Sequence, residues 1–211
     1  MAKQPSFSAS VFLNCPFDTE YQPLFEALVF CVIDCGFVPR SALDAPDAGT
    51  PRIDRICKLV ESCSLSIHDL CRVEPSNGLP RSNMPFELGL DIGCRRFGPL
   101  RARRKKCLIL DSQPYRYQRF LSDIAGQDIR AHDDSAEKLI TSVRDWLRGA
   151  SEGRTIPGPN SIKRRFRDFS AALPGICDAA DLDRSTIDFA DYKTLVEGWL
   201  SARPNELQAA P

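Results

Sequence analysis

The sequence predicts an α/β fold: a flavodoxin-like, doubly wound, five-stranded parallel sheet with a small C-terminal helical appendage. The first observation is that short apolar runs alternate with segments of helical periodicity along residues 1–150. The second is that these runs stop at residues such as Pro16, Asp69 and Asp111. Alternation of this kind places helices on both faces of a parallel sheet. We expect the strand order 2-1-3-4-5.

Five apolar runs are the expected strands. They are Val11–Asn14, Phe37–Leu43, Ser64–Leu70, Lys106–Leu110 and Asp128–Ala131. Pro39 lies inside the second run, and proline cannot donate a ladder hydrogen bond, so this strand should be an edge or irregular strand.

Apolar residues at helical spacing predict the helices between these strands. They are Tyr21–Ile33, a helix that begins after Thr50-Pro51, Pro85–Gly93, Tyr115–Ala125 and a helix capped by Ser135. Gly36 should end the first helix, and Thr50 should cap the second.

The division of the chain follows from the same pattern. Residues 1–150 form the α/β domain, and residues 151–160, which contain several Gly and Pro, read as a linker. Residues 161–200 hold two or three short helices, and residues 201–211 are expected to be a frayed tail.

Composition excludes several classes of protein. The 211 residues include 28 basic and 28 acidic side chains, and zero net charge argues against a dedicated nucleic-acid binder. No apolar run reaches the length of about 18 residues that a membrane span needs. The polar start, Met1–Ser10, is unlike a secretory signal, so we expect a cytoplasmic protein.

Nine cysteines and two histidines are an unusual pair of counts. The cysteines form no C-x-x-C pair and mostly lie in apolar runs, so we expect buried, reduced thiols and no metal site. The scarcity of histidine disfavours histidine acid–base catalysis.

Ligands of doubly wound sheets bind outside the carboxyl ends of the strands. This rule selects the loops at 14–18, 44–49, 68–87 and 111–117. No G-x-G-x-x-G or Walker loop occurs, so the usual phosphate cradles are absent from the sequence.

The most informative stretch is Arg81–Gly89, which follows the third strand. Helix capping explains part of it, with Asn83 as the N-cap and Glu87 as an acid near the helix start. Capping does not explain Gly89, since glycine inside a helix costs about 1 kcal/mol relative to alanine. Close packing or room for a ligand are the alternatives there.

The strand end Ser66-Ile67-His68-Asp69, a polar loop and then Arg-x-Asn-x-x-Phe-Glu-Leu-Gly resemble the TIR-like nucleotide-binding proteins of bacteria. The same residues are similar to the related nucleoside 2-deoxyribosyltransferases. The resemblance covers about residues 11–148. It implies N-glycosidic bond chemistry with Glu87 as the catalytic carboxylate and with NAD as substrate, no cofactor being required.

Cleavage of nicotinamide from ribose passes through an oxocarbenium-like state, and a carboxylate beside the anomeric carbon stabilises its positive charge. Because the nicotinamide group is cationic before cleavage, it leaves without needing a proton. The resemblance also implies a role in antiviral defence and either a homo-oligomer or an activating protein partner. We expect no membrane or nucleic-acid partner.

Six further residues are candidate substrate contacts, each with a structural alternative. Asn83 would bind ribose hydroxyls or hold Glu87, or else cap the helix. Arg81 would contact phosphate or lie solvated in the loop. Asp69 would orient a ribose or only end the strand. The remaining candidates are Asn14, which follows the first strand, and Phe12 and Phe17, which would stack on a base or belong to the core.

Arg52 and Arg55 would reach a pyrophosphate or lie solvated on the second helix. Two basic clusters lie away from the expected pocket. The one at residues 95–106 suits a solvated loop, or else a partner or nucleic-acid contact, and the one at residues 163–167 would dock an acidic partner or a phosphate backbone.

Two other functions stay open. The same pocket in a non-catalytic nucleotide sensor would not need Glu87. A nucleoside 2-deoxyribosyltransferase would need an acid to protonate the leaving base, and Asp69 or Asp18 would supply it.

Overall fold

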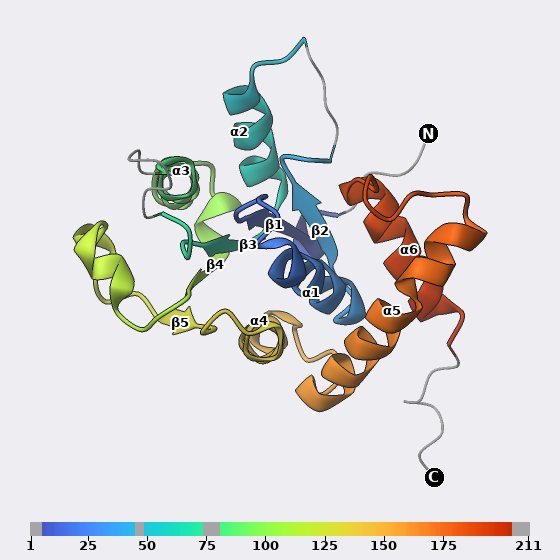
Figure 1. Ribbon diagram of the computed structural model, residues 1–211. Coiled ribbons are helices and arrows are strands. Elements are labelled where there is room, and N and C mark those ends of the chain that lie inside the picture. Colours follow the sequence, from blue (N-terminus) through green and yellow to red (C-terminus); the bar gives the residue numbers. More distant parts are fainter. Residues whose placement is uncertain (1–5, 45–48, 74–80, 204–211) are drawn as a thin grey trace.

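The computed structural model describes residues 6–44, 49–73 and 81–203. Its centre is one parallel sheet with the strand order β2-β1-β3-β4-β5 (Figure 1), which confirms the predicted fold class and order. The strands are β1 (Ser10–Asn14), β2 (Val38–Ser41), β3 (Leu65–Asp69), β4 (Lys106–Asp111) and β5 (Ile129–Ala131). As Pro39 predicts, β2 lies at an edge of the sheet.

The helices connect and cover these strands. They are α1 (Gln22–Asp34), α2 (Arg52–Ser62), α3 (Asn83–Phe97), α4 (Ala136–Ala150), α5 (Pro159–Ala179) and α6 (Phe189–Ser201). Short 3-10 turns occur at η1 (Phe7–Ala9), η2 (Ala102–Arg104), η3 (Arg116–Arg119) and η4 (Ser122–Ile124). No helix in the described part of the chain is long and apolar enough to cross a membrane.

The alternation of side chains along β1 separates two hydrophobic layers. Phe12 packs with Ile56 and Val60 of α2 on one face. Val11 and Leu13 point to the other face, into the cluster that holds α1 and α4. Figure 1 shows the resulting arrangement, with α2 and α3 on one side of the sheet and α1 and α4 on the other.

The C-terminal helices α5 and α6 form a further layer outside α1 (Figure 1). The ring of Phe169 lies 5.5 Å from Phe30 of α1 and 5.4 Å from Trp199 of α6. Arg165 of α5 binds Asp34 at 2.8 Å. Since Phe169 is fully buried in the cluster that also holds β1, these helices share the core of the sheet.

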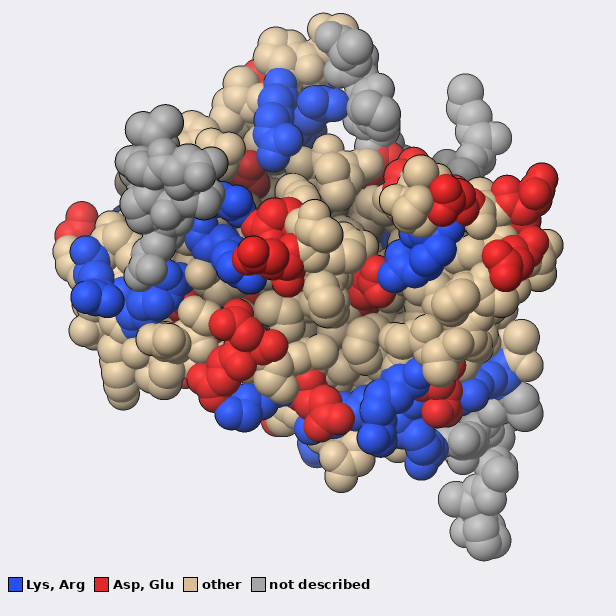
Figure 2. Space-filling view, in the orientation of Figure 1, with Lys and Arg blue, Asp and Glu red and all other residues tan. Residues whose placement is uncertain are grey.

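Charges are interspersed on the surface. Figure 2 shows acidic and basic side chains mixed across one face, with a group of Lys and Arg over α5, where residues 163–167 lie. Part of that cluster is used internally, because Arg165 pairs with Asp34. The nine thiols are all unpaired, six of them buried and three half-buried.

Several local predictions are wrong. Tyr115–Ala125 is two 3-10 turns rather than a helix, since Tyr115 has a left-handed φ of 61°. The N-cap of α2 is Pro51, not Thr50. Asn83 is the first residue of α3 rather than its cap, and α3 runs on to Phe97. Gly89 is exposed and has nothing within 4 Å of an added Cβ, so close packing does not explain it.

We predict that Phe169→Ala lowers the free energy of unfolding by about 3–5 kcal/mol, because it opens a cavity between α1, α5 and α6. Phe97→Ala is the matched control, since Phe97 is 83% exposed, and it should change stability by less than about 0.5 kcal/mol. Urea unfolding followed by circular dichroism measures both. Equal effects would contradict a core shared between the sheet and the C-terminal helices.

Candidate active site

A cleft of about 520 Å³ lies where the carboxyl ends of β1 and β2 meet the C-terminal helices. The loop after β1 contributes Phe17, α1 contributes Gln22 and Phe25, and the segment after β2 contributes Ala42 and Leu43. The start of α2 and the start of α6 complete the lining with Arg52, Arg55, Ile187, Asp188, Phe189 and Tyr192. The cleft therefore lies at the carboxyl edge of the sheet, as predicted. One of its walls is formed by α6, which the sequence did not predict to be part of the site.

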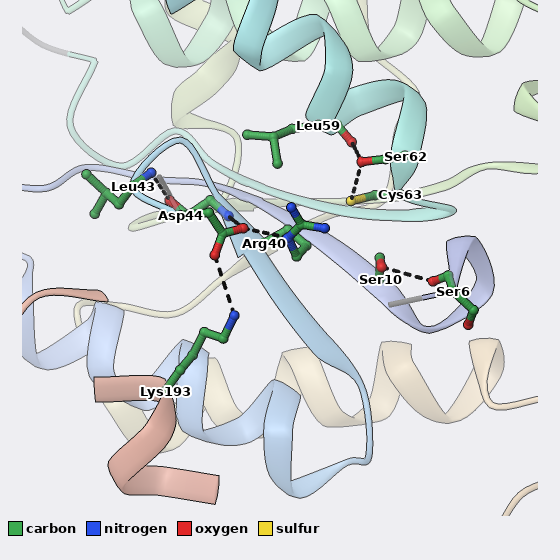
Figure 3. A network of polar contacts seen from close by, with 10 residues as sticks. Ser6, Ser10, Arg40, Leu43, Asp44, Leu59, Ser62, Cys63 and Lys193 are labelled. Atoms are coloured by element: carbon green, nitrogen blue, oxygen red, sulfur yellow. Dashed lines mark hydrogen bonds and ion pairs between the residues drawn. The ribbon is translucent and has the colours of Figure 1, made fainter. Parts of the chain in front are cut away.

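Asp44 holds that wall in place, as Figure 3 shows. Its carboxylate accepts a hydrogen bond from Arg40 Nε at 2.5 Å and from the Ser41 amide at 3.2 Å. Lys193 of α6 reaches the other carboxylate oxygen at 3.5 Å. The segment after β2 and the helix α6 are thus joined by one ion-paired carboxylate.

Glu87 lies in the second turn of α3 and is only 5% exposed. Its Oε1 is 3.6 Å from Nη2 of Arg52, whose side chain is half-exposed and lines the cleft. Burial raises the pKa of Glu87, and Arg52 opposes that rise. The site therefore combines a poorly solvated carboxylate with a cation that joins it to the cleft.

Asp91, one turn after Glu87, anchors α3 to the sheet. Its carboxylate accepts hydrogen bonds from Ser66 and from His68 Nε2, the latter at 3.2 Å, both on β3. The buried ammonium of Lys105 lies 3.1 Å from Oδ1. Although burial acts in the opposite direction, these donors lower the pKa of Asp91 to about 2.

Asn14 continues this network to the start of α3. Its side-chain nitrogen lies 2.9 Å from both the Met84 carbonyl oxygen and His68 Nδ1. Because the carbonyl can only accept, this atom is the donating amide, and Nδ1 of His68 is an acceptor. In its neutral form His68 therefore carries its proton on Nε2 and donates it to Asp91.

Asp69, at the end of β3, is enclosed in a second network. Its carboxylate accepts from Tyr21 Oη at 2.7 Å and from the Cys71 amide at 3.0 Å, and His132 Nε2 lies at 3.1 Å. Against the effect of burial, these contacts lower the pKa of Asp69. A carboxylate with no exposed surface and three partners is a structural anchor rather than a ligand group.

Two groups of side chains have the composition of a metal site: His68, Asp91 and Cys107, and Asp69, Cys71 and His132. A metal on Nε2 of either histidine would need the proton on Nδ1. Nδ1 of His68 faces the Asn14 donor, and Nδ1 of His132 accepts from the Asp134 amide at 3.1 Å. The hydrogen bonds therefore disfavour a metal ion in both groups.

The structure divides the predicted substrate contacts into two sets. Phe12, Asn14 and Asp69 are buried, and Phe12 is a core residue whose ring meets His68 edge-on at 5.9 Å. None of these three lines this cleft, because packing and hydrogen bonds use them internally.

The other set is accessible. Phe17 is 42% exposed and lines the cleft, and it packs edge-on against Phe25 at 5.7 Å. Arg81 is half-exposed and forms an ion pair with Asp18. Asn83 is exposed on the first turn of α3.

Sequence reasoning missed two buried residues of the site. Asp91 is four residues after Glu87, a spacing that places both carboxylates on one face of α3 and was a usable signal. His132 follows a strand of three residues, and nothing in its neighbourhood distinguishes it.

Comparison of the chain with protein-family models, with curated proteins and with solved structures found no match.

We predict that Glu87→Gln leaves the protein at least as stable as the wild type at pH 7, with a gain of up to about 1 kcal/mol. A raised pKa means that ionising Glu87 costs stability as the pH rises above the value of an unfolded glutamate, about 4.3. Thermal melts of both proteins from about pH 3.5 to about pH 8 test this. The difference should vanish at the acidic end, and a variant that is less stable at pH 7 would contradict it.

We predict that Asp91→Asn lowers the free energy of unfolding at pH 7 by about 3 kcal/mol, because it leaves buried Lys105 without a counter-charge. A lowered pKa stabilises the fold above the ordinary carboxyl value near 3.8, and this stability is lost as the pH falls toward about 2. Urea titrations across that range should show a steeper loss for the wild type than for Asp91→Asn.

The double variant Asp91→Asn/Lys105→Met should recover part of the lost stability, since it removes both buried charges. An additive effect of the two substitutions would show that the pair is not coupled.

Proposed function

We propose that this protein is a TIR-like N-glycosidase that hydrolyses the nicotinamide–ribose bond of NAD⁺ or of a related nucleotide, with Glu87 as its catalytic carboxylate. The observation that carries the proposal is the position of Glu87: a nearly buried carboxylate, after β3, joined through Arg52 to a cleft at the carboxyl edge of the sheet. That edge is where doubly wound sheets bind ligands.

The chemistry needs few groups. Water adds to the anomeric carbon, the electron pair of the breaking C–N bond returns to the pyridinium ring, neutral nicotinamide leaves and one proton is released. The carboxylate of Glu87 stabilises the positive charge that develops on the ribose, and a poorly solvated site strengthens that interaction.

The cleft offers complementary groups for the rest of a nucleotide. Arg52 and Arg55 supply guanidinium groups for a pyrophosphate. Phe17 and Leu43, both about two-fifths exposed, supply apolar surface for a ring. These residues replace Phe12, Asn14 and Asp69 in our assignment of substrate contacts.

The state of the nearby acids favours a cationic leaving group. A neutral nucleoside base would need a proton from Asp69 or Asp18. The pKa of Asp69 is lowered against the effect of burial by its hydrogen bonds, and Arg81 lowers that of Asp18 in the same way. Neither is a good proton donor at neutral pH, which supports NAD⁺ hydrolysis over deoxyribosyl transfer.

The test is incubation of concentrated wild-type protein and Glu87→Gln with NAD⁺, followed by chromatography of the products. We expect nicotinamide and ADP-ribose from the wild type, and a loss of about a hundredfold or more in the variant. Arg52→Ala should mainly raise KM. If Glu87→Gln releases nicotinamide as fast as the wild type, Glu87 is not the catalytic carboxylate.

A parallel incubation with a deoxynucleoside and a second free base tests the alternative of a nucleoside 2-deoxyribosyltransferase. Formation of the new deoxynucleoside would support the transferase. Binding of NAD⁺ without turnover, with or without a partner protein, would instead support the sensor. The proposed homo-oligomer is tested by whether activity per molecule rises steeply with protein concentration. The activating partner and the role in antiviral defence remain proposals that the resemblance implies.

A further inference from the structure

A second cleft, of about 640 Å³, lies at the opposite, amino edge of the sheet. It is formed by η1, by the starts of β3 and β4, by the segment around η2 and by the end of α4. Its lining is Phe7, Ser8, Ser64, Leu65, Leu100, Arg101, Arg103, Arg104, Lys106, Ala150 and Glu152. The proposed glycosidase site uses none of these residues.

The lining is strongly basic. Four of its side chains are cations, and Glu152 is the one carboxylate among the lining residues. Arg101 stacks over the ring of Phe7 at 5.5 Å, and Lys106 donates to the Gly149 carbonyl at 3.1 Å. Within residues 6–44, 49–73 and 81–203, no carboxylate forms an ion pair with Arg103 or Arg104. Two exposed guanidinium groups therefore remain available beside a concave surface.

The frame of this cleft is fixed by buried contacts. Lys105 turns inward, where its ammonium donates to the carbonyls of Val60 at 2.7 Å and Cys63 at 2.5 Å. Ala102 is also buried. With these two residues held inside, the intervening Arg103 and Arg104 are kept on the exposed side of the segment.

Backbone hydrogen bonds hold together the segments at the base of this cleft. The Ser64 amide donates to the Phe7 carbonyl at 3.0 Å, and the Lys106 amide donates to the Ser64 carbonyl at 3.0 Å. The apolar part of the lining, Phe7, Leu65 and Leu100, is thereby held next to the cations. Leu100 is 77% exposed and adds apolar surface to the lining.

We propose that this amino-edge cleft binds a nucleoside polyphosphate. Guanidinium groups match phosphate oxygens in pairs, and Arg103, Arg104 and Lys106 supply three cations for the phosphate chain. Phe7 and Leu100 supply the apolar surface that a base covers. The volume lies in the range of pockets that enclose one small molecule.

A nucleic-acid backbone is the less suitable occupant. Such a binder presents an extended basic surface and a basic overall charge, whereas this chain has zero net charge and these cations line one cleft of about 640 Å³. A single nucleotide matches the volume of the cleft and its adjoining apolar surface.

The test is calorimetric titration of the full chain with ATP, with inorganic tripolyphosphate and with a single-stranded oligonucleotide of thymidine. We expect ATP to bind, and Arg103→Ala/Arg104→Ala to weaken it by about tenfold or more. The matched control is Arg95→Ala/Arg96→Ala, which removes the same charge from exposed positions of α3 outside the cleft. The control should bind ATP as the wild type does.

Each other result overturns the proposal. Tripolyphosphate that binds as tightly as ATP would show that no base is recognised. An oligonucleotide that displaces ATP would indicate a nucleic-acid site. If ATP does not bind, or if the control variant loses ATP binding equally, the cleft is not a nucleotide-binding site.

The two proposed sites are separated by a further variant. ATP binding lost in Arg52→Ala but kept in Arg103→Ala/Arg104→Ala would place the nucleotide in the carboxyl-edge cleft. Conversely, Arg103→Ala/Arg104→Ala should leave release of nicotinamide unchanged, so either proposal can fail without the other.

Discussion

The buried carboxylate of Asp91 is the constraint on which the carboxyl-edge site depends. A carboxylate that is 2% exposed must be fully hydrogen-bonded or paired, and Ser66, His68 and Lys105 meet that requirement. Two of these partners are on β3 and the third precedes β4. Together with the hydrogen bond from Asn14 to the Met84 carbonyl, this group fixes the position of α3 over the sheet, and with it the position of Glu87 one turn earlier.

The two edges of the sheet have different electrostatics for a simple topological reason. The carboxyl edge collects the acids that end β3 and β4, and each has internal partners: Asp69 contacts His132 and accepts a hydrogen bond from Tyr21, and Asp111 is ion-paired with Arg116. The amino edge collects Lys105, Lys106 and the arginines before them. Zero net charge over the whole chain therefore does not imply an equal balance at each edge of the sheet.

The sequence was sufficient for the fold because hydrophobic runs of strand length cannot be buried any other way when helices alternate with them. The sequence was insufficient where the role of a residue depends on whether its side chain is buried, which the hydrophobic pattern does not show. Phe12 and Phe17 look alike in the sequence, yet one faces α2 in the core and the other lines the cleft. Asn83 has the chemistry of a cap, but α3 begins one residue earlier than a cap at that position would allow.

The same limit applies to the site. Glu87 could be singled out because it follows a strand end in a distinctive motif. Phe189 and Tyr192 could not, because they are about a hundred residues away and join the cleft only through packing of α6 on α1. Since a ribosome delivers the chain from its N-terminus, the wall formed by α6 is added last. Any chemistry that requires the closed cleft is consequently withheld from the nascent protein until residues 189–192 have emerged.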